Sequence, residues 1–374
     1  MNILHIYKDY HPVLGGIENH VKVLAEAQAA AGHTVTVLAC DPGPRTRMEE
    51  SNGVRVIKAG RITTAASMPL SPSQPFILAR LRPDVVHVHS PYPLGEVANW
   101  LLGRARATVI THHSDVVRQR GWLRLYGPLL RRVLAAADRI IATSPRYIET
   151  SPWLGPLRDK CVVVPLGVDT RRFTPPTNQP TNQLTNQPTN QLTNHPSILF
   201  TGRLRYYKGI DTLITALGNL PGVHLNIVGE GPMREVWATQ AAEMGLSERV
   251  HFLGEVDDAE LPDIYRQADL FVLPCNARAE AFGSVLLEAM ASGLACITTE
   301  VGSGTSWVVQ DGVTGLVVPP RDPQALAQAI RSLLDDPERR AAMGRAGRAR
   351  VEAGFTIEQM IARVQAVYEE VLTR

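Results

Sequence analysis

Short apolar runs rich in Val, Ile and Leu alternate along the chain with longer stretches whose apolar residues recur every three or four positions. The short runs are typical of strands in a sheet that is buried on both faces, and the longer stretches of helices that cover such a sheet. In the first half, helical patterns lie between several of the strands, for example over 17–31, which Gly32 ends. The strands are expected at 2–7, 34–39, 54–58, 84–88, 107–111, 139–143 and 161–164.

The second half of the chain repeats this alternation. Two such blocks predict an α/β protein with two doubly wound domains, whose ligands bind at the carboxyl ends of parallel strands. Strands are expected at 197–201, 223–228, 249–253, 270–273, 295–299 and 314–318, and helices at 209–218, 231–244, 259–267, 283–291 and 323–335. Two last helices are expected at 337–353 and 356–373, separated by Gly354-Phe355-Thr356.

Between the two blocks, Thr177 to Pro196 consists of five tetrads of the type Thr-Asn-Gln-Pro or Thr-Asn-Gln-Leu. A period of four with almost no apolar residues cannot build a core, so this tract is expected to be a linker. The predicted organisation is therefore an N-terminal Rossmann-like acceptor domain at 1–173, a linker at 174–196 and a second Rossmann-like domain at 197–355. The final helix, 356–374, is expected to pack back toward the N-terminal domain.

The composition narrows the class of protein. The 374 residues are 44% hydrophobic and 20% charged, which excludes a chain that is disordered throughout. No signal peptide begins the sequence and no run of about 18 apolar residues is present, so a cytoplasmic location is expected. A reducing compartment also fits, because no Cys-x-x-Cys pair occurs among Cys40, Cys161, Cys275 and Cys296.

Positive charge is concentrated in the first half. Residues 1–173 hold 22 Lys and Arg against 13 Asp and Glu, a net charge of +9, and residues 174–374 hold 16 against 23, a net charge of −7. In the basic segment Arg118–Arg132, Trp122 and Leu123 stand among the arginines, as in segments that bind anionic lipid at the inner face of the cell membrane. A solvated basic face with inward-packed apolar residues gives the same pattern. No nucleic-acid-binding module is present, so nucleic acid is not an expected partner.

The clearest candidate for chemistry follows the expected strand 270–273. Residues 280–293 read Glu-Ala-Phe-Gly-Ser-Val-Leu-Leu-Glu-Ala-Met-Ala-Ser-Gly, and Phe282-Gly283 is expected to make the turn into a helix. The free amides at that helix start are an anion site. Glu280 precedes the helix and Glu288 lies within it, and an ionised carboxylate accepts hydrogen bonds from two adjacent hydroxyls of a polyol. The spacing alone also fits two surface acids on a helix.

This region resembles the retaining glycosyltransferases of family 4, which have the GT-B architecture: two facing Rossmann-like domains with parallel sheets and an interdomain cleft. The similarity extends over nearly the whole chain apart from the repeats, and it depends on the order and spacing of several motifs. It implies that the turn at Phe282-Gly283 binds the donor. The motifs are Gly202-Arg203-Leu204 with Lys208-Gly209, Val228 to Pro232, Gly254-Glu255-Val256, Ala268 to Pro274, Glu280 to Gly293 and Asp311 to Val318.

The resemblance implies a role for each matching residue. Glu288 would bind the ribose hydroxyls of the donor nucleotide, and Glu280 the hydroxyls of the donor sugar. Arg203 and Lys208 would neutralise the departing diphosphate, which agrees with the general rule that fixed cations stabilise charge developing in the transition state. Val256 would touch the base through its backbone.

Two features of the first half fit the same family. Gly15 and Gly16 lie between the first strand and a helix, where glycines let the backbone approach a phosphate, although a tight turn alone also explains them. In the family this loop lies beneath the donor diphosphate. His112 and His113 end another strand, where the family has a histidine lining the donor-sugar pocket, and the spacing to Asp115 favours His113. A histidine at a strand end is otherwise as often structural.

Metal use and the substrates follow from the same comparison. No Asp-x-Asp metal clamp is present, and Arg203 and Lys208 can take the role of Mg²⁺. We therefore expect catalysis without a metal ion and without a cofactor beyond the nucleotide-sugar co-substrate. The family implies retention, and front-face attack is preferred because no nucleophile is evident. Similarity of the Gly302 to Val318 region to bacterial surface-polysaccharide enzymes favours GDP-mannose as donor and a glycan or lipid-linked acceptor.

Two alternatives remain open from the sequence. A nucleotide-sugar 2-epimerase of the same architecture would release free sugar or the epimer without an acceptor. A non-catalytic nucleotide-sugar-binding protein would bind the donor and leave it intact. The complete set of Glu280, Glu288, Arg203 and Lys208 argues against the second alternative.

Overall fold

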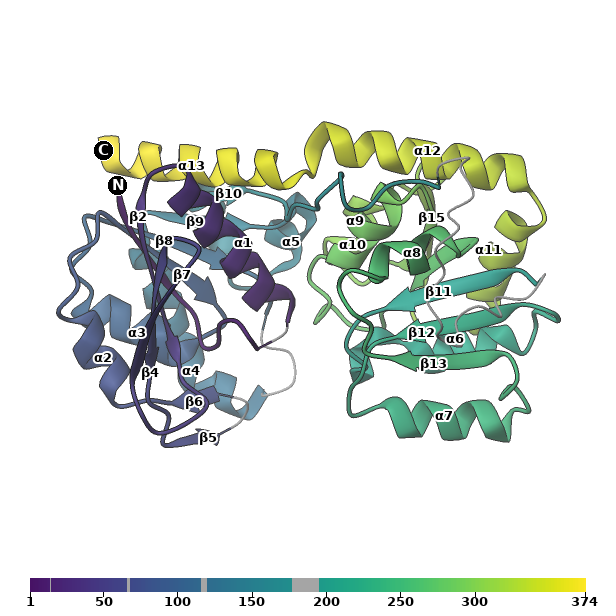
Figure 1. The fold of residues 1–374 in the computed structure, drawn as a ribbon, viewed down its shortest axis with the longest axis horizontal. Helices are drawn as coiled ribbons and strands as arrows, with labels where there is room; N and C mark the ends of the chain where they lie inside the picture. Colours follow the sequence, from purple (N-terminus) through teal and green to yellow (C-terminus); the bar gives the residue numbers. More distant parts are fainter. Residues whose placement is uncertain (14, 66–67, 116–119, 177–194) are drawn as a thin grey trace. The chain divides into compact units, whose positions relative to one another are not determined.

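The computed structural model describes residues 1–13, 15–65, 68–115, 120–176 and 195–374, with the side chains of residues 120 and 122–125 left out. They form two compact units, one of Met1–Leu166 with Glu358–Arg374 and the other of Gly167–Ile357. Each unit is a sheet with helices packed on it, as the alternating pattern predicted (Figure 1). The repeat tract lies outside the described residues except for its last two positions.

The sheet of the first unit has the strand order β10-β9-β8-β7-β1-β2-β4-β3 and is parallel except where β3 pairs with β4. Its strands are β1 Asn2–Ile6, β2 Thr34–Cys40, β3 Arg47–Ser51, β4 Val54–Ala59, β7 Val85–Ser90, β8 Ala107–His112, β9 Arg139–Ala142 and β10 Cys161–Val163. A separate antiparallel pair consists of β5 Thr63–Ala65 and β6 Met68–Leu70. The helices are α1 Gly16–Ala30, α2 Ser73–Leu78, α3 Pro93–Leu102, α4 Arg120–Ala136 and α5 Pro145–Thr150, followed by a 3₁₀ helix, Gly155–Lys160.

All seven strands predicted for this half are confirmed, whereas β3, β5 and β6 were missed. Strand β3 reads Arg-Met-Glu-Glu-Ser and is exposed at every position. It forms the edge of the sheet, where charged residues discourage pairing with other chains. The search for apolar runs could not find such a strand.

The sheet of the second unit is fully parallel, with the order β13-β12-β11-β14-β15-β16. All six of its predicted strands are confirmed: β11 Ser197–Thr201, β12 His224–Val228, β13 Val250–Gly254, β14 Leu270–Leu273, β15 Ala295–Thr299 and β16 Gly315–Val318. The helices are α6 Ile210–Leu217, α7 Arg234–Glu243, α8 Leu261–Arg266, α9 Ser284–Ala291, α10 Thr305–Val308, α11 Pro323–Leu334 and α12 Pro337–Gly354.

Each sheet has a point at which the direction of strand addition reverses. In the first unit the chain adds β2 and β4 on one side of β1 and β7 to β10 on the other. In the second unit it adds β12 and β13 on one side of β11 and β14 to β16 on the other. Ligands of doubly wound sheets bind at the carboxyl ends of the strands beside this point. The β1/β7 and β11/β14 junctions are therefore the places to search for a site.

The chain crosses between the units twice. Helix α13, Ile357–Thr373, buries Met360, Val364 and Tyr368 in the core of the first unit. The first crossing lies at Gly167 rather than after residue 173, the expected domain end. The backbone of Val168 explains the shift, because its N–H donates to the carbonyl of Phe355 at 2.9 Å and so joins the second unit.

None of the helices in the described ranges combines the length and apolar character that crossing a membrane requires.

Candidate active site

The carboxyl ends of β11 and β14 bring two charged side chains together. Lys208 ends a short 3₁₀ helix, Tyr206–Lys208, that follows β11, and Glu280 stands between β14 and α9. Nζ of Lys208 lies 2.6 Å from Oε2 of Glu280, and the side chains keep 9% and 13% of their surface exposed. Burial lowers the pKa of Lys208, but the facing carboxylate outweighs burial and the pKa lies above its usual value. Lys208 is therefore a fixed cation at neutral pH.

A glycine allows the turn after β11 to approach the end of β14. Gly209 has φ +70°, and a Cβ at this position would lie 2.0 Å from the carbonyl oxygen of Pro274. The N–H of Asn276 donates to the carbonyl of Tyr207 at 2.9 Å, which joins the same two segments. This close approach places Lys208 over the end of the neighbouring strand, within reach of Glu280.

Glu288 lies on α9 and is held by a tyrosine. The hydroxyl of Tyr265 donates to Oε2 of Glu288 at 2.7 Å and lies 2.6 Å from Oγ1 of Thr201, at the end of β11. Burial raises the pKa of Tyr265 well above its usual value, so its hydroxyl keeps its proton. Burial also raises the pKa of Glu288 to about 7, although the Tyr265 hydrogen bond opposes the shift. Oε1 of Glu288 accepts no hydrogen bond from any residue that the structure describes.

The turn before α9 has the form that the sequence predicted. Gly283 caps the helix with φ +79°, where a Cβ would lie 2.9 Å from Leu273 and 3.2 Å from Thr305. The ring of Phe282 is buried, 6.5 Å from the ring of Trp307 and 6.4 Å from that of Phe355. Because the ring is buried, only the backbone of Phe282 is available to contact the donor.

Arg203 and Val256 lie at the same edge of this sheet. Arg203 follows β11, is exposed and forms no ion pair with the residues that the structure describes. Val256 lies two residues after β13 and is half-buried. Neither forms a hydrogen bond to Glu280 or Glu288 within the described chain. The fold therefore places both residues at the expected edge, whereas it links only Lys208 and Glu280 directly.

The first unit presents its own features at the β1/β7 junction. Gly15 precedes α1, and a Cβ at Gly15 would lie 2.1 Å from Oε2 of Glu18, whereas a Cβ at Gly16 would meet nothing within 4 Å. The Glu18 side chain is flexible and can move aside, and the backbone of Gly15 is extended with φ 176°, so the surroundings require glycine at neither position. His113 follows β8, is 5% exposed, and its N–H donates to the carbonyl of Ser90 at 2.9 Å.

The two adjacent histidines after β8 have different partners. Nε2 of His112 lies 3.0 Å from Oδ1 of Asp115, and its Nδ1 lies 3.2 Å from the hydroxyl of Ser90. Nε2 of His113 lies 3.0 Å from Nδ1 of His89 on β7. Asp115 contacts His112 and not His113. The sequence spacing between Asp115 and the two histidines therefore does not favour His113 as the residue of the donor-sugar pocket. The assignment of His113 depends instead on its position at the junction.

Sequence reasoning missed Tyr265 and the histidines around His113, namely His5, His20, His87 and His89. His87 and His89 are two apart on β7 and therefore share one face of it. The predicted strand, 84–88, ended one residue before His89, so this signal was missed. No comparable signal existed for Tyr265, because its partners Thr201 and Glu288 lie 64 and 23 residues away in the sequence.

Known proteins are similar to this chain over nearly its whole length. A family model described as Glycosyltransferase Family 4 matches residues 14–172, and one described as Glycosyl transferases group 1 matches residues 183–350. The D-rhamnosyltransferase WbpZ of Pseudomonas aeruginosa is 37% identical over 361 residues, 95% of this chain and 92% of that protein. This chain belongs to glycosyltransferase family 4. It is an enzyme of the glycosyltransferase class, as the sequence motifs predicted.

Two further comparisons support the same conclusion for this family 4 glycosyltransferase. The O-antigen chain mannosyltransferase C of Escherichia coli is 33% identical over 377 residues, 100% of this chain and 99% of that protein. The sucrose-phosphate synthase of Thermosynechococcus elongatus superimposes with a TM-score of 0.79 at 26% identity and covers 99% of both chains. The predicted GT-B fold of two Rossmann-like domains is confirmed.

Proposed function

We propose that this glycosyltransferase moves mannose from GDP-mannose to a glycan or lipid-linked acceptor during synthesis of a cell-surface polysaccharide. The reaction retains the anomeric configuration and needs no metal ion. The observation that carries the proposal is the Lys208–Glu280 ion pair at the β11/β14 junction, with Glu288 on the helix that follows. The sugar is supported by the E. coli relative, whose name makes it a mannosyltransferase of the O-antigen chain.

Charge at the junction suits a departing nucleoside diphosphate. When the bond between sugar and phosphate breaks, negative charge grows on the phosphate oxygens. Lys208 is held charged by Glu280, and Arg203 adds a second cation at the same strand end. Because Lys208 is held in place before the reaction, it stabilises the leaving group without reorganisation, and the exposed Arg203 adds charge beside it. They supply the charge that Mg²⁺ supplies in other enzymes, which supports a metal-independent reaction.

The two carboxylates suit the hydroxyls of the donor. Oε1 of Glu288 is without a hydrogen bond from the described residues, so the ribose can donate to it while Tyr265 holds the other oxygen. Glu280 accepts from Lys208 and can accept also from a sugar hydroxyl, because a carboxylate has about four acceptor positions. An ion-paired carboxylate is a weak nucleophile. We therefore favour front-face attack over a covalent intermediate as the route to retention. In front-face attack the acceptor approaches the sugar on the side from which the phosphate departs, and the phosphate takes the acceptor's proton.

An assay of donor consumption in excess EDTA tests this proposal and both alternatives. The purified enzyme is incubated with a panel of nucleotide sugars, with and without a lipid-linked glycan acceptor. We expect GDP-mannose to be consumed fastest, mannose to be transferred only when the acceptor is present, and added Mg²⁺ or Mn²⁺ to leave the rate unchanged. A rate that needs the metal contradicts metal independence. An epimer formed from the donor alone indicates the 2-epimerase, and binding without consumption indicates a non-catalytic protein.

We also infer that the first unit binds the anionic inner face of the cell membrane. The segment Arg118–Arg132 suggested this contact, and most of its N-terminal part lies outside the described side chains. Among the described residues, the last turn of α3 leaves Trp100, Leu101 and Leu102 exposed by 39%, 63% and 41%, and the exposed Arg104 follows. Apolar side chains beside arginines suit the boundary between lipid headgroups and acyl chains.

Co-sedimentation with vesicles tests this inference. Each Arg near an anionic surface contributes about 1 kcal/mol, so replacing three by Gln is expected to weaken binding about a hundredfold, and salt should weaken it as well. The variant changes Arg118, Arg120 and Arg124, and the matched control changes the exposed Arg321, Arg339 and Arg345 of the second unit. The inference would be contradicted if the parent bound neutral and anionic vesicles equally. It would also be contradicted if the control variant lost as much binding as the Arg118, Arg120 and Arg124 variant.

A further inference from the structure

Histidines gather at the β1/β7 junction of the first unit in a number that the proposed reaction does not explain. His5 comes from β1, His20 from α1, and His87 and His89 from β7, and His113 follows β8. The rings of His89 and His113 lie 5.3 Å apart, and the ring of His20 lies 5.6 Å from the first and 5.1 Å from the second. Among these histidines, the resemblance to family 4 gives a role only to His113, at the donor-sugar pocket.

We propose that His20, His89 and His113 form a binding site for Zn²⁺, and that a Zn²⁺ ion bound there inhibits the transferase. One ring nitrogen of each histidine lies within 4.8 Å of those of the other two. Imidazole nitrogen is a preferred ligand of Zn²⁺, and three histidines with an open fourth position are an established ligand set.

His20 has a buried ring nitrogen without a hydrogen-bond partner in the described chain. This nitrogen is Nε2, and it is buried although the residue as a whole is half-buried. Buried polar atoms nearly always have a partner, and a bound ion supplies one where the protein does not. A metal ion bound to Nε2 satisfies this atom.

The spacing of the other two ligands suits the same ion. Nε2 of His113 and Nδ1 of His89 are 3.0 Å apart, and two nitrogens bound tetrahedrally to Zn²⁺ at about 2.0–2.1 Å are roughly 3.3 Å apart. The pair therefore has to open by only a few tenths of an ångström. Burial lowers the pKa of His20 to about 4 and those of His89 and His113 well below their usual value, so all three are neutral ligands at pH 7.

A second layer of hydrogen bonds already gives His89 the tautomer that a metal ligand needs. Nε2 of His5 donates to Oε1 of Gln28 at 2.8 Å, which leaves Nδ1 of His5 as an acceptor. Nε2 of His89 donates to that nitrogen at 3.1 Å, so Nδ1 of His89 carries a lone pair directed at His113. Metal-bound histidines are generally oriented by such a donation from their other nitrogen. On metal binding, His113 has only to move its proton from Nε2 to Nδ1.

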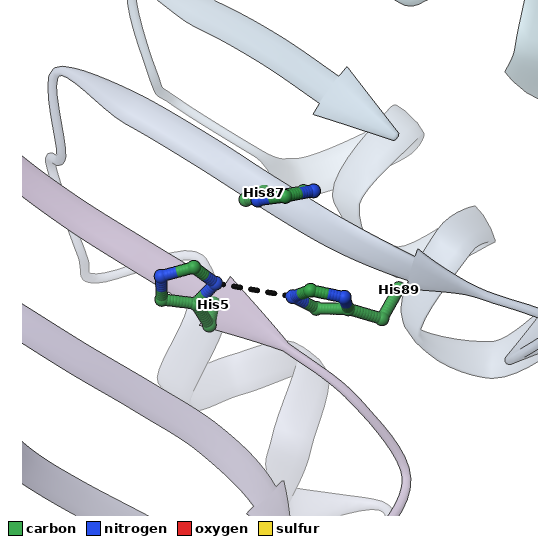
Figure 2. A group of neighbouring side chains, drawn as sticks. All are labelled: His5, His87 and His89. Carbon is green, nitrogen blue, oxygen red and sulfur yellow. Dashed lines mark hydrogen bonds between the residues drawn. The ribbon is translucent and has the colours of Figure 1, made fainter. Parts of the chain in front are cut away.

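A second trio, His5, His87 and His89, is less suited to a metal ion. Figure 2 shows the ring of His87 lying apart from the hydrogen bond between His5 and His89, nearly parallel to the ring of His89. Its nitrogens have other partners, because Nδ1 lies 2.6 Å from the hydroxyl of Tyr368 and Nε2 lies 2.5 Å from Oγ1 of Thr111. A ring that presents its face offers no lone pair to an ion beside His89.

Inhibition follows from the place of His113 and depends on the proposed function. A metal ion on its Nε2 fixes the ring that is assigned to the donor-sugar pocket and adds two positive charges beside a site for a neutral sugar. Zn²⁺ is thus expected to slow turnover of an enzyme that is fully active in EDTA.

Metal binding is measured first, without reference to activity. Calorimetric titration of the full-length protein with Zn²⁺ is expected to show one tight equivalent, and Co²⁺ should give the visible absorption of a four-coordinate ion. His20→Gln is expected to weaken this binding at least tenfold with little change in Tm, because Nε2 of His20 has no hydrogen bond to lose within the described chain. The matched control is His251→Gln, since His251 and His224 form a histidine pair 3.1 Å apart in the other unit. If His20→Gln bound Zn²⁺ as tightly as the parent, or if only His251→Gln lost Zn²⁺ binding, the proposed site would be wrong.

Activity then separates the two proposals. We expect Zn²⁺ to inhibit donor turnover in the parent enzyme, and the concentration for half-inhibition to rise at least tenfold in His20→Gln and to stay unchanged in His251→Gln. Zn²⁺ binding by an enzyme that transfers no sugar would leave the metal site standing and reject the proposed function. Zn²⁺ binding that depends on His20 without any inhibition would reject the link between this site and the donor pocket.

Discussion

Lys208→Met is expected to lower kcat/KM by about a hundredfold or more, a loss of roughly 2.7 kcal/mol in transition-state binding. The substitution keeps the volume of the side chain and removes the cation that faces the leaving diphosphate. It also leaves Glu280, which is 13% exposed, without the ammonium 2.6 Å away. Breaking a buried pair by removing one partner costs about 3–5 kcal/mol, so Tm should fall as well. Steady-state kinetics and thermal melting measure the two effects.

A double variant separates the catalytic loss from the loss of stability. Lys208→Met combined with Glu280→Gln removes both charges, and replacing a buried pair as a whole is often neutral for folding. We expect Tm to recover toward that of the parent, whereas kcat/KM stays at least a hundredfold down. If activity recovered together with Tm, the pair would be structural and Lys208 would have no direct part in catalysis.

Glu288→Gln is expected to have opposite effects on activity and stability. Burial raises the pKa of Glu288 to about 7 from the usual 4.5, so between these values the folded chain holds a proton that the unfolded chain has released. The stability of the parent therefore falls as pH rises through this window and stays lower above it. Gln has no charge to bury and still accepts from Tyr265. We expect the variant to be more stable than the parent by about 2 kcal/mol at pH 8 and equal to it near pH 4.

The same substitution should lower kcat/KM for the donor at least tenfold, because an amide oxygen accepts less strongly than a carboxylate and its NH₂ cannot accept from a ribose hydroxyl. In the parent, KM for the donor should rise as pH falls below about 7, since protonation removes an acceptor from Glu288. The Gln variant should lack this rise. A variant with parental kcat/KM, or with the same pH dependence of KM, would remove the assignment of Glu288 to the ribose.

The sequence alone determined the architecture because each strand of a doubly wound sheet has a local signature. A strand buried on both faces must be apolar throughout, as Leu270–Leu273 is, and a covering helix must be apolar on one side. The break between α12 and α13 was found for the same reason, since Gly354-Phe355-Thr356 interrupts the helical period. Strand β3 shows the limit of this reasoning, because an exposed edge strand buries no face and has no apolar run.

Part of the candidate site was also predictable. Lys208, Glu280 and Glu288 stand in motifs whose order resembles that of a known family, and parallel strands bring their carboxyl ends to one edge. The resemblance supplied the roles, whereas the residues alone supplied only a cation and two carboxylates after strands.

Only the tertiary structure decided which of these groups meet and in what state. Lys208 and Glu280 are 72 residues apart, and their contact depends on the pairing of β11 with β14 and on the backbone approach at Gly209. The pKa of Glu288 and its bond to Tyr265 depend on burial that no local pattern encodes. The histidines of the first unit come together because His5 and His87 are neighbours in the register of β1 and β7. The local sequence determines which residues face into a sheet, and strand order and register, set by contacts far apart in the chain, determine which of them become neighbours.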